Sequence, residues 1–189
     1  MLEFRLEDHS YWLDGVRLPS VTQVLSEMGF YGDAAAYFTE YSRDRGTYVH
    51  KAIQLYEDGE LDEESLDPVI RPYLKAWKQF KHDSGFIVSA SEKAMASVTY
   101  QFAGTVDLLG TFEDTTCAII DIKTGAVGPV VGLQLAAYEI LEGTHGRKRF
   151  ALQLKEDGKY KLHQFTNRQD RQIFLSALSV YQWKKANLK

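Results

Sequence analysis

Two aspartates and a lysine near the middle of the chain are the side chains best suited to chemistry. Asp107 precedes Asp121 by fourteen residues, and Lys123 follows Asp121 by two. The residues from 118 to 124 form an apolar, largely β-branched run that predicts a buried strand. Residues two apart on a strand share a face, so Asp121 and Lys123 should point to one side while Ile120 and Ile122 pack on the other.

Burying a carboxylate and an ammonium at a strand end is costly unless something compensates. A divalent cation held by Asp107 and Asp121, with Lys123 beside it, would compensate, and this arrangement suits metal-assisted phosphodiester hydrolysis. The alternative is a solvated strand end or a simple ion pair, because D-x-K sequences are common and surface pairs are weak. Further candidate ligands elsewhere in the chain would favour the metal site over the simple ion pair.

His50 and Glu92 are further candidate ligands. His50 closes the sequence Arg45-Gly46-Thr47-Tyr48-Val49-His50 within a helical pattern, and its imidazole could join oxygen ligands around Mn²⁺ or Mg²⁺. A helical Gly46 costs about 1 kcal/mol relative to alanine, which indicates close approach of another backbone or a break in the helix. Glu92 lies in the predicted strand before that of Asp107. The alternative for His50 is a purely structural role.

Gln134 and Tyr138 lie four residues apart on the helix predicted after the D-x-K strand, and therefore on one helical face. There they could edge the site and offer an amide and a phenol to a phosphate or a nucleotide. The alternative is a partly buried tyrosine with its hydroxyl in water.

The order of elements predicts one α/β domain with a mixed sheet, because helices precede a strand meander and a last helix lies over it. We divide it into an N-terminal hairpin and helix (1–30), a helical region (31–85), a catalytic sheet with a helix (86–165) and a C-terminal helix (166–189). The N-terminal half is predicted to begin with a hairpin over 2–18 that turns at Asp14-Gly15, followed by a helix that Ser20 caps and Gly29 ends. A helical stretch over 33–58 with a break near Ser42 comes next. The following helix is predicted to start at Asp67-Pro68 and to end before Gly85, and Pro72 either kinks it or shifts its start. The C-terminal half is predicted to hold strands over 86–94, 98–102, 105–112 and 117–123, a helix over 131–141, a hairpin of 149–154 with 159–165, and a helix over 168–185 capped by Asn167.

Composition bounds the class of protein. The chain has 189 residues, 44% hydrophobic and 25% charged, which is ordinary for one globular domain. The single cysteine, Cys117, excludes an intrachain disulfide and a four-cysteine cluster, and we expect it to pack within its strand. We expect a cytoplasmic protein without a membrane partner, because no apolar run would span a bilayer and the start lacks signal-peptide features. No phosphate-binding loop of an ATP motor is present.

The net charge of −4 is unfavourable for a nucleic-acid binder, because phosphate contacts supply most non-specific affinity. An acidic metal site would nevertheless offset a basic groove, and the bound ion adds positive charge. The candidates for such a groove are Arg43, Arg45, Lys75, Lys78, Lys81, Arg147, Lys148, Arg149, Lys184 and Lys185.

These motifs together resemble the PD-(D/E)XK nuclease superfamily, in particular its RecB-like and phage-type exonuclease branch. The match lies in the order of five motifs between about residues 9 and 140, with Val106 in place of the proline of the family name. The matching residues are Arg45-Gly46-x-x-x-His50, Glu92, Gly104-Thr105-Val106-Asp107, Asp121-Ile122-Lys123-Thr124-Gly125 and Gln134-x-x-x-Tyr138, preceded by an opening from His9-x-Tyr11 through Asp14-Gly15 to Pro19-Ser20-Val21-Thr22.

The resemblance implies a restriction-endonuclease-like core and a site for Mg²⁺ or Mn²⁺. Asp107 and Asp121 would bind the metal together with His50, the backbone carbonyl of Ile122 and, as an additional candidate, Glu92. Lys123 would orient the attacking water and stabilise charge on the phosphate. The residues that would contact substrate are Gln134, Tyr138, Arg45 and Thr124.

The implied activity is a metal-dependent deoxyribonuclease, an exonuclease of phage-type DNA recombination, repair or processing. DNA would be its partner, with a separate annealing or helicase protein and a homo-oligomer as further partners. The alternatives are a structure-specific endonuclease, a non-catalytic DNA-binding or assembly module that kept the fold, and a hydrolase of small phosphoesters. Steep loss of binding with salt would favour a DNA enzyme over the last.

Overall fold

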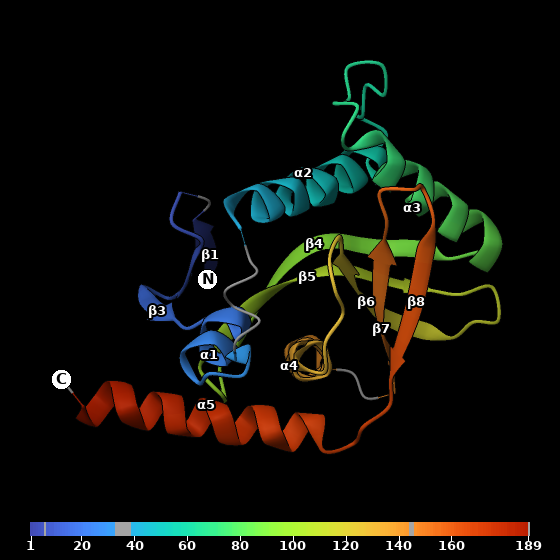
Figure 1. The fold of residues 1–189 in the computed structure, drawn as a ribbon. Coiled ribbons are helices and arrows are strands. Elements are labelled where there is room, and N and C mark those ends of the chain that lie inside the picture. The colour runs from blue at the N-terminus through green and yellow to red at the C-terminus, as the bar shows by residue number, and fades with distance from the viewer. Residues whose placement is uncertain (6, 33–38, 144–145, 189) are drawn as a thin grey trace.

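A five-stranded mixed sheet with helices on both faces forms the centre of the protein (Figure 1). The computed structural model describes residues 1–5, 7–32, 39–143 and 146–188. The strand order is β4-β5-β6-β7-β8; β6 and β7 run parallel and the other neighbours antiparallel. The strands are β4 (Ile87–Ser97), β5 (Phe102–Thr111), β6 (Cys117–Lys123), β7 (Lys148–Leu154) and β8 (Tyr160–Phe165). The predicted α/β architecture with a mixed sheet is confirmed.

Each face of this sheet buries its own hydrophobic cluster. Helices α2 (Glu40–Glu57) and α3 (Arg71–Ser84) cover one face and pack against Ile120 and Ile122 of β6. Helices α4 (Val130–Glu142) and α1 (Val21–Glu27) cover the other face, and α5 (Asp170–Asn187) packs beyond them (Figure 1). Strand β6 therefore ends between α2 on one side and α4 on the other, which is where the predicted site residues lie.

A second, three-stranded sheet precedes this core. It pairs β1 (Leu2–Arg5), β2 (Ser10–Leu13) and β3 (Val16–Leu18). The predicted turn at Asp14-Gly15 is confirmed, with φ of 49° and 81°; such positive φ angles match the twist of a hairpin. The predicted cap of α1 is also confirmed, because the Ser20 hydroxyl accepts a hydrogen bond from the backbone N–H of Gln23 at 3.0 Å.

Two predicted boundaries in the first half of the chain are wrong. Helix α2 begins at Glu40 and continues through Ser42 without a break. Thr39 caps it, since the Thr39 hydroxyl accepts a hydrogen bond from the Ser42 backbone N–H at 3.2 Å. The predicted helical residues 33–38 lie outside the described residues. Helix α3 begins at Arg71 rather than at Asp67-Pro68, with Pro72 in its first turn. Of the two alternatives for this proline, a shifted start is correct.

The predicted strand over 98–102 is also wrong. Strand β4 continues to Ser97, and residues 98–101 form the turn that leads into β5, with Gln101 at a φ of 54°. The two short strands predicted from 86 to 102 are therefore one strand and a turn. A run of apolar and β-branched residues can occupy a tight turn when its neighbours satisfy the backbone; here the Tyr100 N–H donates a hydrogen bond to the Ser97 hydroxyl at 3.1 Å.

Two further expectations need correction. The N-cap of helix α5 is Gln169 rather than the predicted Asn167, so the helix begins later than expected. The Asn167 side chain accepts a hydrogen bond from the Gln169 backbone N–H at 3.0 Å. Cys117 is exposed rather than packed, because it is the first residue of β6. Among the described residues, no helix combines the length and the apolar character that crossing a membrane requires.

Candidate metal centre

Three carboxylates stand in a row across β4, β5 and β6. The pairing register places Glu92 opposite Asp107, and one pair beyond Leu108↔Ile120 it places Asp121 opposite Asp107. Like charges directly opposite one another on neighbouring strands are destabilising. A row of three calls for positive charge among them.

His50 of α2 closes the row. Its Nδ1 lies 3.1 Å from Glu92 Oε1 and 3.7 Å from Asp107 Oδ2, while its Nε2 lies 3.2 Å from the carbonyl oxygen of Ile122. His50, Glu92 and Asp107 each offer a ligand atom, and these atoms lie within 4.8 Å of one another. The structure thus brings together three of the predicted ligands and puts the predicted Ile122 carbonyl beside them.

Asp121 is a buried carboxylate whose hydrogen-bonding capacity is unused. Its side chain is 1% exposed, and Oδ2 lies 2.6 Å from Lys123 Nζ. Apart from this ion pair, neither carboxylate oxygen of Asp121 accepts a hydrogen bond from the described residues. Asp107, by contrast, accepts the Ile122 backbone N–H at 2.6 Å. Buried polar atoms are almost always bonded, so the Oδ1 atom of Asp121, which has no partner among the described residues, fits a site that receives a cation.

The pKa values in the metal-free protein reflect this excess of negative charge. Burial raises the pKa of Asp121 to about 6, although Lys123 opposes the rise. Burial also raises the pKa of Asp107. Burial alone would lower the pKa of His50, but Asp107 and Glu92 outweigh it and raise the value to about 9. Protons therefore occupy the centre when no metal does, and oxygen and imidazole ligands of this kind suit Mg²⁺ or Mn²⁺.

Gln134 and Tyr138 of α4 face Lys123 rather than solvent. They are 7% and 4% exposed. Lys123 Nζ donates to Gln134 Oε1 at 3.4 Å, and Gln134 Nε2 donates to the Tyr138 hydroxyl at 2.9 Å. A Cβ at Gly104 would lie 3.1 Å from the Tyr138 ring, so this glycine gives the ring its space. The tyrosine hydroxyl is therefore hydrogen-bonded within the protein, and the substrate contact predicted for Gln134 and Tyr138 stays a prediction.

Arg45 and His50 of α2 both reach backbone carbonyls at the C-terminal end of the strand that carries Asp121. Arg45 Nη2 donates to the Thr124 carbonyl at 3.3 Å, two residues beyond the Ile122 carbonyl beside His50. A Cβ at Gly46 would lie 3.8 Å from the Thr124 hydroxyl, which is ordinary contact. The glycine thus marks neither a break in α2 nor a forced close approach.

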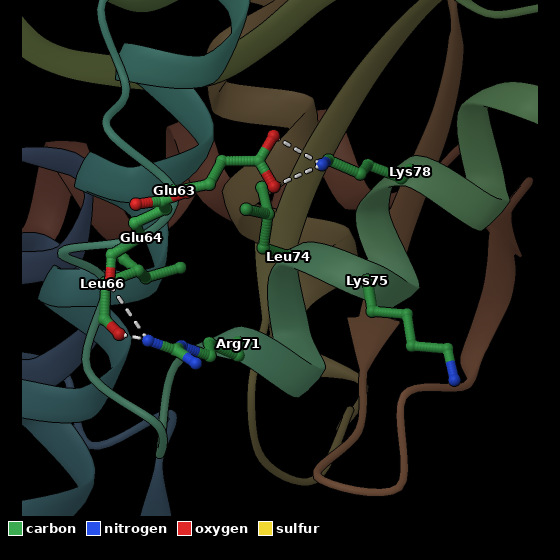
Figure 2. Close-up of a pocket in the computed structure, with 7 residues that line it drawn as sticks. All are labelled: Glu63, Glu64, Leu66, Arg71, Leu74, Lys75 and Lys78. Atoms are coloured by element: carbon green, nitrogen blue, oxygen red, sulfur yellow. Dashed lines mark hydrogen bonds and ion pairs between the residues drawn. The ribbon is translucent and has the colours of Figure 1, made fainter.

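Several of the predicted groove cations are already paired. Buried Arg149 contacts Asp170 at 3.2 Å, Lys81 contacts Glu57 at 2.7 Å and Lys185 contacts Glu27 at 2.9 Å. The hollow that Figure 2 shows between α3 and the loop before it holds Lys78 against the Glu63 carboxylate, and Arg71 donates to the Glu64 and Leu66 carbonyls. The predicted groove cations that already contact a carboxylate therefore include Arg149, Lys81, Lys185 and Lys78.

The sequence did not single out Thr105 or assign a role to Tyr11. The Tyr11 hydroxyl lies 2.8 Å from the Thr105 hydroxyl and so ties the N-terminal sheet to β5 beside the carboxylates. Thr105 precedes Asp107 by two residues and shares its strand face. That spacing is the signal that could have identified it.

No protein-family model matches this sequence, and no curated protein matches it. Among solved structures, one described as a candidate exonuclease from Eubacterium rectale aligns with 91% of this chain and 83% of its own, at 13% identity and a TM-score of 0.58. An alkaline exonuclease from Laribacter hongkongensis aligns with 88% of this chain and 92% of its own, at 16% identity and a TM-score of 0.40. Of these two, only the Eubacterium rectale structure is similar enough to support a conclusion. At 13% identity, it shows that the two chains share a fold.

Proposed function

We propose that this protein is a metal-dependent deoxyribonuclease that hydrolyses phosphodiester bonds. The carrying observation is that His50, Glu92 and Asp107 lie together beside the buried carboxylate of Asp121, which pairs with the ammonium of Lys123. Clustered oxygen ligands with an adjacent lysine suit hydrolysis of a phosphate ester. The shared fold with a structure described as a candidate exonuclease supports the same class.

In this proposal His50, Asp107, Asp121, the Ile122 carbonyl and Glu92 hold Mg²⁺ or Mn²⁺. When bound, the ion acidifies a water and offsets charge that develops on the phosphate. Lys123 lies beside the row of carboxylates with its Nζ anchored by Asp121 and Gln134. Its role is to orient the attacking water and to place a compact positive charge against a phosphate oxygen.

The substrate is DNA, and we propose attack from ends rather than at internal sequences. This preference rests on the motif resemblance and on the description of the Eubacterium rectale structure. A place in phage-type recombination or repair, with a separate annealing or helicase protein and self-association of the chain, belongs to the same proposal. Arg45 and Thr124 would contact the DNA, because they lie at the open end of β6 next to Lys123.

Cleavage of end-labelled linear DNA and covalently closed circles, single- and double-stranded, tests this function. Each substrate is incubated with Mg²⁺, Mn²⁺ or EDTA, and Lys123→Ala is the matched variant. Metal-dependent loss of linear DNA that spares circles and is absent in the variant is the expected result. Cutting of circles would make the protein an endonuclease. No metal-dependent cleavage by folded protein would overturn the proposal in favour of a binding module.

A further inference from the structure

A hollow of about 390 Å³ opens directly beyond the C-terminal ends of β6 and β7. It adjoins the candidate metal centre, because Thr124 directly follows Lys123, the last residue of β6, and Arg45 lies on α2 about one turn and a half before His50. Thus the hollow and the metal centre share the end of one strand. The lining residues that matter here are Arg45, Tyr73, Thr124, Gln153, Lys155 and Glu156.

Arg45 is fixed in this hollow with donors to spare. Its Nη2 donates to the Thr124 carbonyl at 3.3 Å, and its Cζ lies 5.8 Å and 5.6 Å from the rings of Tyr41 and Tyr73. Its Nε is buried and has no hydrogen-bond partner among the described residues. An unmet buried donor is costly, and more so on a charged group. A planar guanidinium held in place in this way is suited to paired hydrogen bonds to a phosphate.

The neighbouring polar groups leave a small net positive charge. Gln153 is committed, since its Nε2 donates to the Gly125 carbonyl at 2.9 Å and its Oε1 lies 3.2 Å from His163 Nε2. Asp157 accepts the Lys159 backbone N–H and lies 3.6 Å from its Nζ. Arg45, Lys155 and Glu156 remain, a net charge of one positive unit. That matches the single negative charge of an internal phosphodiester better than the double charge of a terminal phosphate.

We propose that this hollow binds an internal backbone phosphate of the substrate strand, next to the phosphate at the metal centre. The inference deepens the proposed nuclease function and rests on it. Arg45 would bind the phosphate through the N–H groups of Nη1 and Nη2, and Lys155 would add charge at the rim. The contact would fix the register of the strand, so that the next phosphate lies against Lys123.

A phosphate-by-phosphate binding experiment tests this site. Lys123→Ala protein with Mg²⁺ binds a short DNA in which one phosphate at a time is replaced by a neutral methylphosphonate. Replacement at one position is expected to weaken binding roughly tenfold, the size of a charge-assisted hydrogen bond. Adding Arg45→Met should weaken binding by a similar factor on normal DNA and abolish the effect of that one methylphosphonate, because the two changes remove the same contact.

Three further variants sharpen the test. Lys155→Met should lower the slope of binding against salt by about one, and it carries the test if Arg45→Met does not fold. Arg45→Lys keeps the charge without the paired geometry and should recover only part of the affinity. Arg168→Met, in the exposed turn before α5 and outside both the hollow and the candidate groove cations, is the control and should bind as the parent does.

The site is wrong if Arg45→Met and Lys155→Met bind as tightly and with the same salt slope as their parent. It is equally wrong if no methylphosphonate position loses its effect in the Arg45→Met protein. In either case, metal-dependent cleavage by the unmodified protein would leave the nuclease function standing. If the unmodified protein neither cleaves nor binds DNA, the function and this site fail together.

Discussion

Glu92 faces Asp107 across two neighbouring strands while its own backbone adopts a left-handed conformation, with a φ of 45°. The other described non-glycine residues with positive φ lie outside the strands. A residue held in this region costs about 1–3 kcal/mol and persists only where its surroundings impose it. The strained residue is a candidate ligand, and its carboxylate lies 3.1 Å from His50 Nδ1.

Replacing Glu92 by glycine and by alanine should separate this strain from the loss of charge. Both variants remove the carboxylate, but only glycine adopts positive φ without cost. We expect Glu92→Gly to have a free energy of unfolding about 1 kcal/mol above that of Glu92→Ala. This order is the reverse of that at an ordinary strand position.

Denaturant unfolding of both proteins in EDTA measures the difference. Equal stabilities, or a more stable Glu92→Ala, would mean that the backbone of Glu92 is not strained. Mn²⁺ affinity should fall in both variants, and Glu92→Gln, which keeps the backbone, serves as the control for charge alone.

Gln134→Leu should lower kcat for DNA cleavage roughly tenfold, because it removes one hydrogen bond to a charged group. The KM should change little, since the Gln134 side chain is buried against Lys123 and Tyr138. Tyr138→Phe should act in the same direction but less, because it removes only the acceptor that orients the amide. Steady-state kinetics with the two variants measures both constants. A raised KM with unchanged kcat would instead return Gln134 to a direct contact with DNA.

Metal affinity should rise with pH between about pH 6 and pH 9. Burial raises the pKa of Asp121 to about 6, and Asp107 with Glu92 raises the pKa of His50 to about 9 against the effect of burial. Both groups must lose their protons to bind a cation, so protons compete with the metal below these values. Calorimetric titration of Mn²⁺ at pH 7 in buffers of different ionisation enthalpy should show proton release. In the His50→Gln variant the release should largely vanish, and equal release in both proteins would exclude His50 as its source.

Arg149 and Lys148 are neighbours in sequence that should differ sharply in their effect on stability. Buried Arg149 donates to Asp170 and to the Gly132 and Asn167 carbonyls. Breaking such a pair leaves an uncompensated buried charge, so Arg149→Met should destabilise the fold by about 3–5 kcal/mol. Exposed Lys148→Met should change the free energy of unfolding by less than about 0.5 kcal/mol. Denaturant unfolding compares them; similar values would show that the Arg149 pair contributes little.

Much of the local structure followed from the sequence. The turn at Asp14-Gly15, the Ser20 cap and the glycine after α3 depend on contacts within a few residues, which sequence patterns report directly. The shared face of Asp121 and Lys123 followed from the strand period, and their 2.6 Å ion pair agrees with it. By contrast, the local pattern misled at the start of α3 and at residues 98–101, where a turn rather than a strand leads into β5.

The sequence alone determined that two aspartates, a lysine, a histidine and a glutamate could form a metal site, because their residue types and strand or helix periods are local properties. Only the tertiary structure decided how they meet. Strand register set Glu92, Asp107 and Asp121 in one row, and the packing of α2 brought His50 to the Ile122 carbonyl. The packing of α4 turned Gln134 inward to Lys123. These relationships join segments far apart in the chain, and register and burial are fixed by the whole core rather than by neighbouring residues.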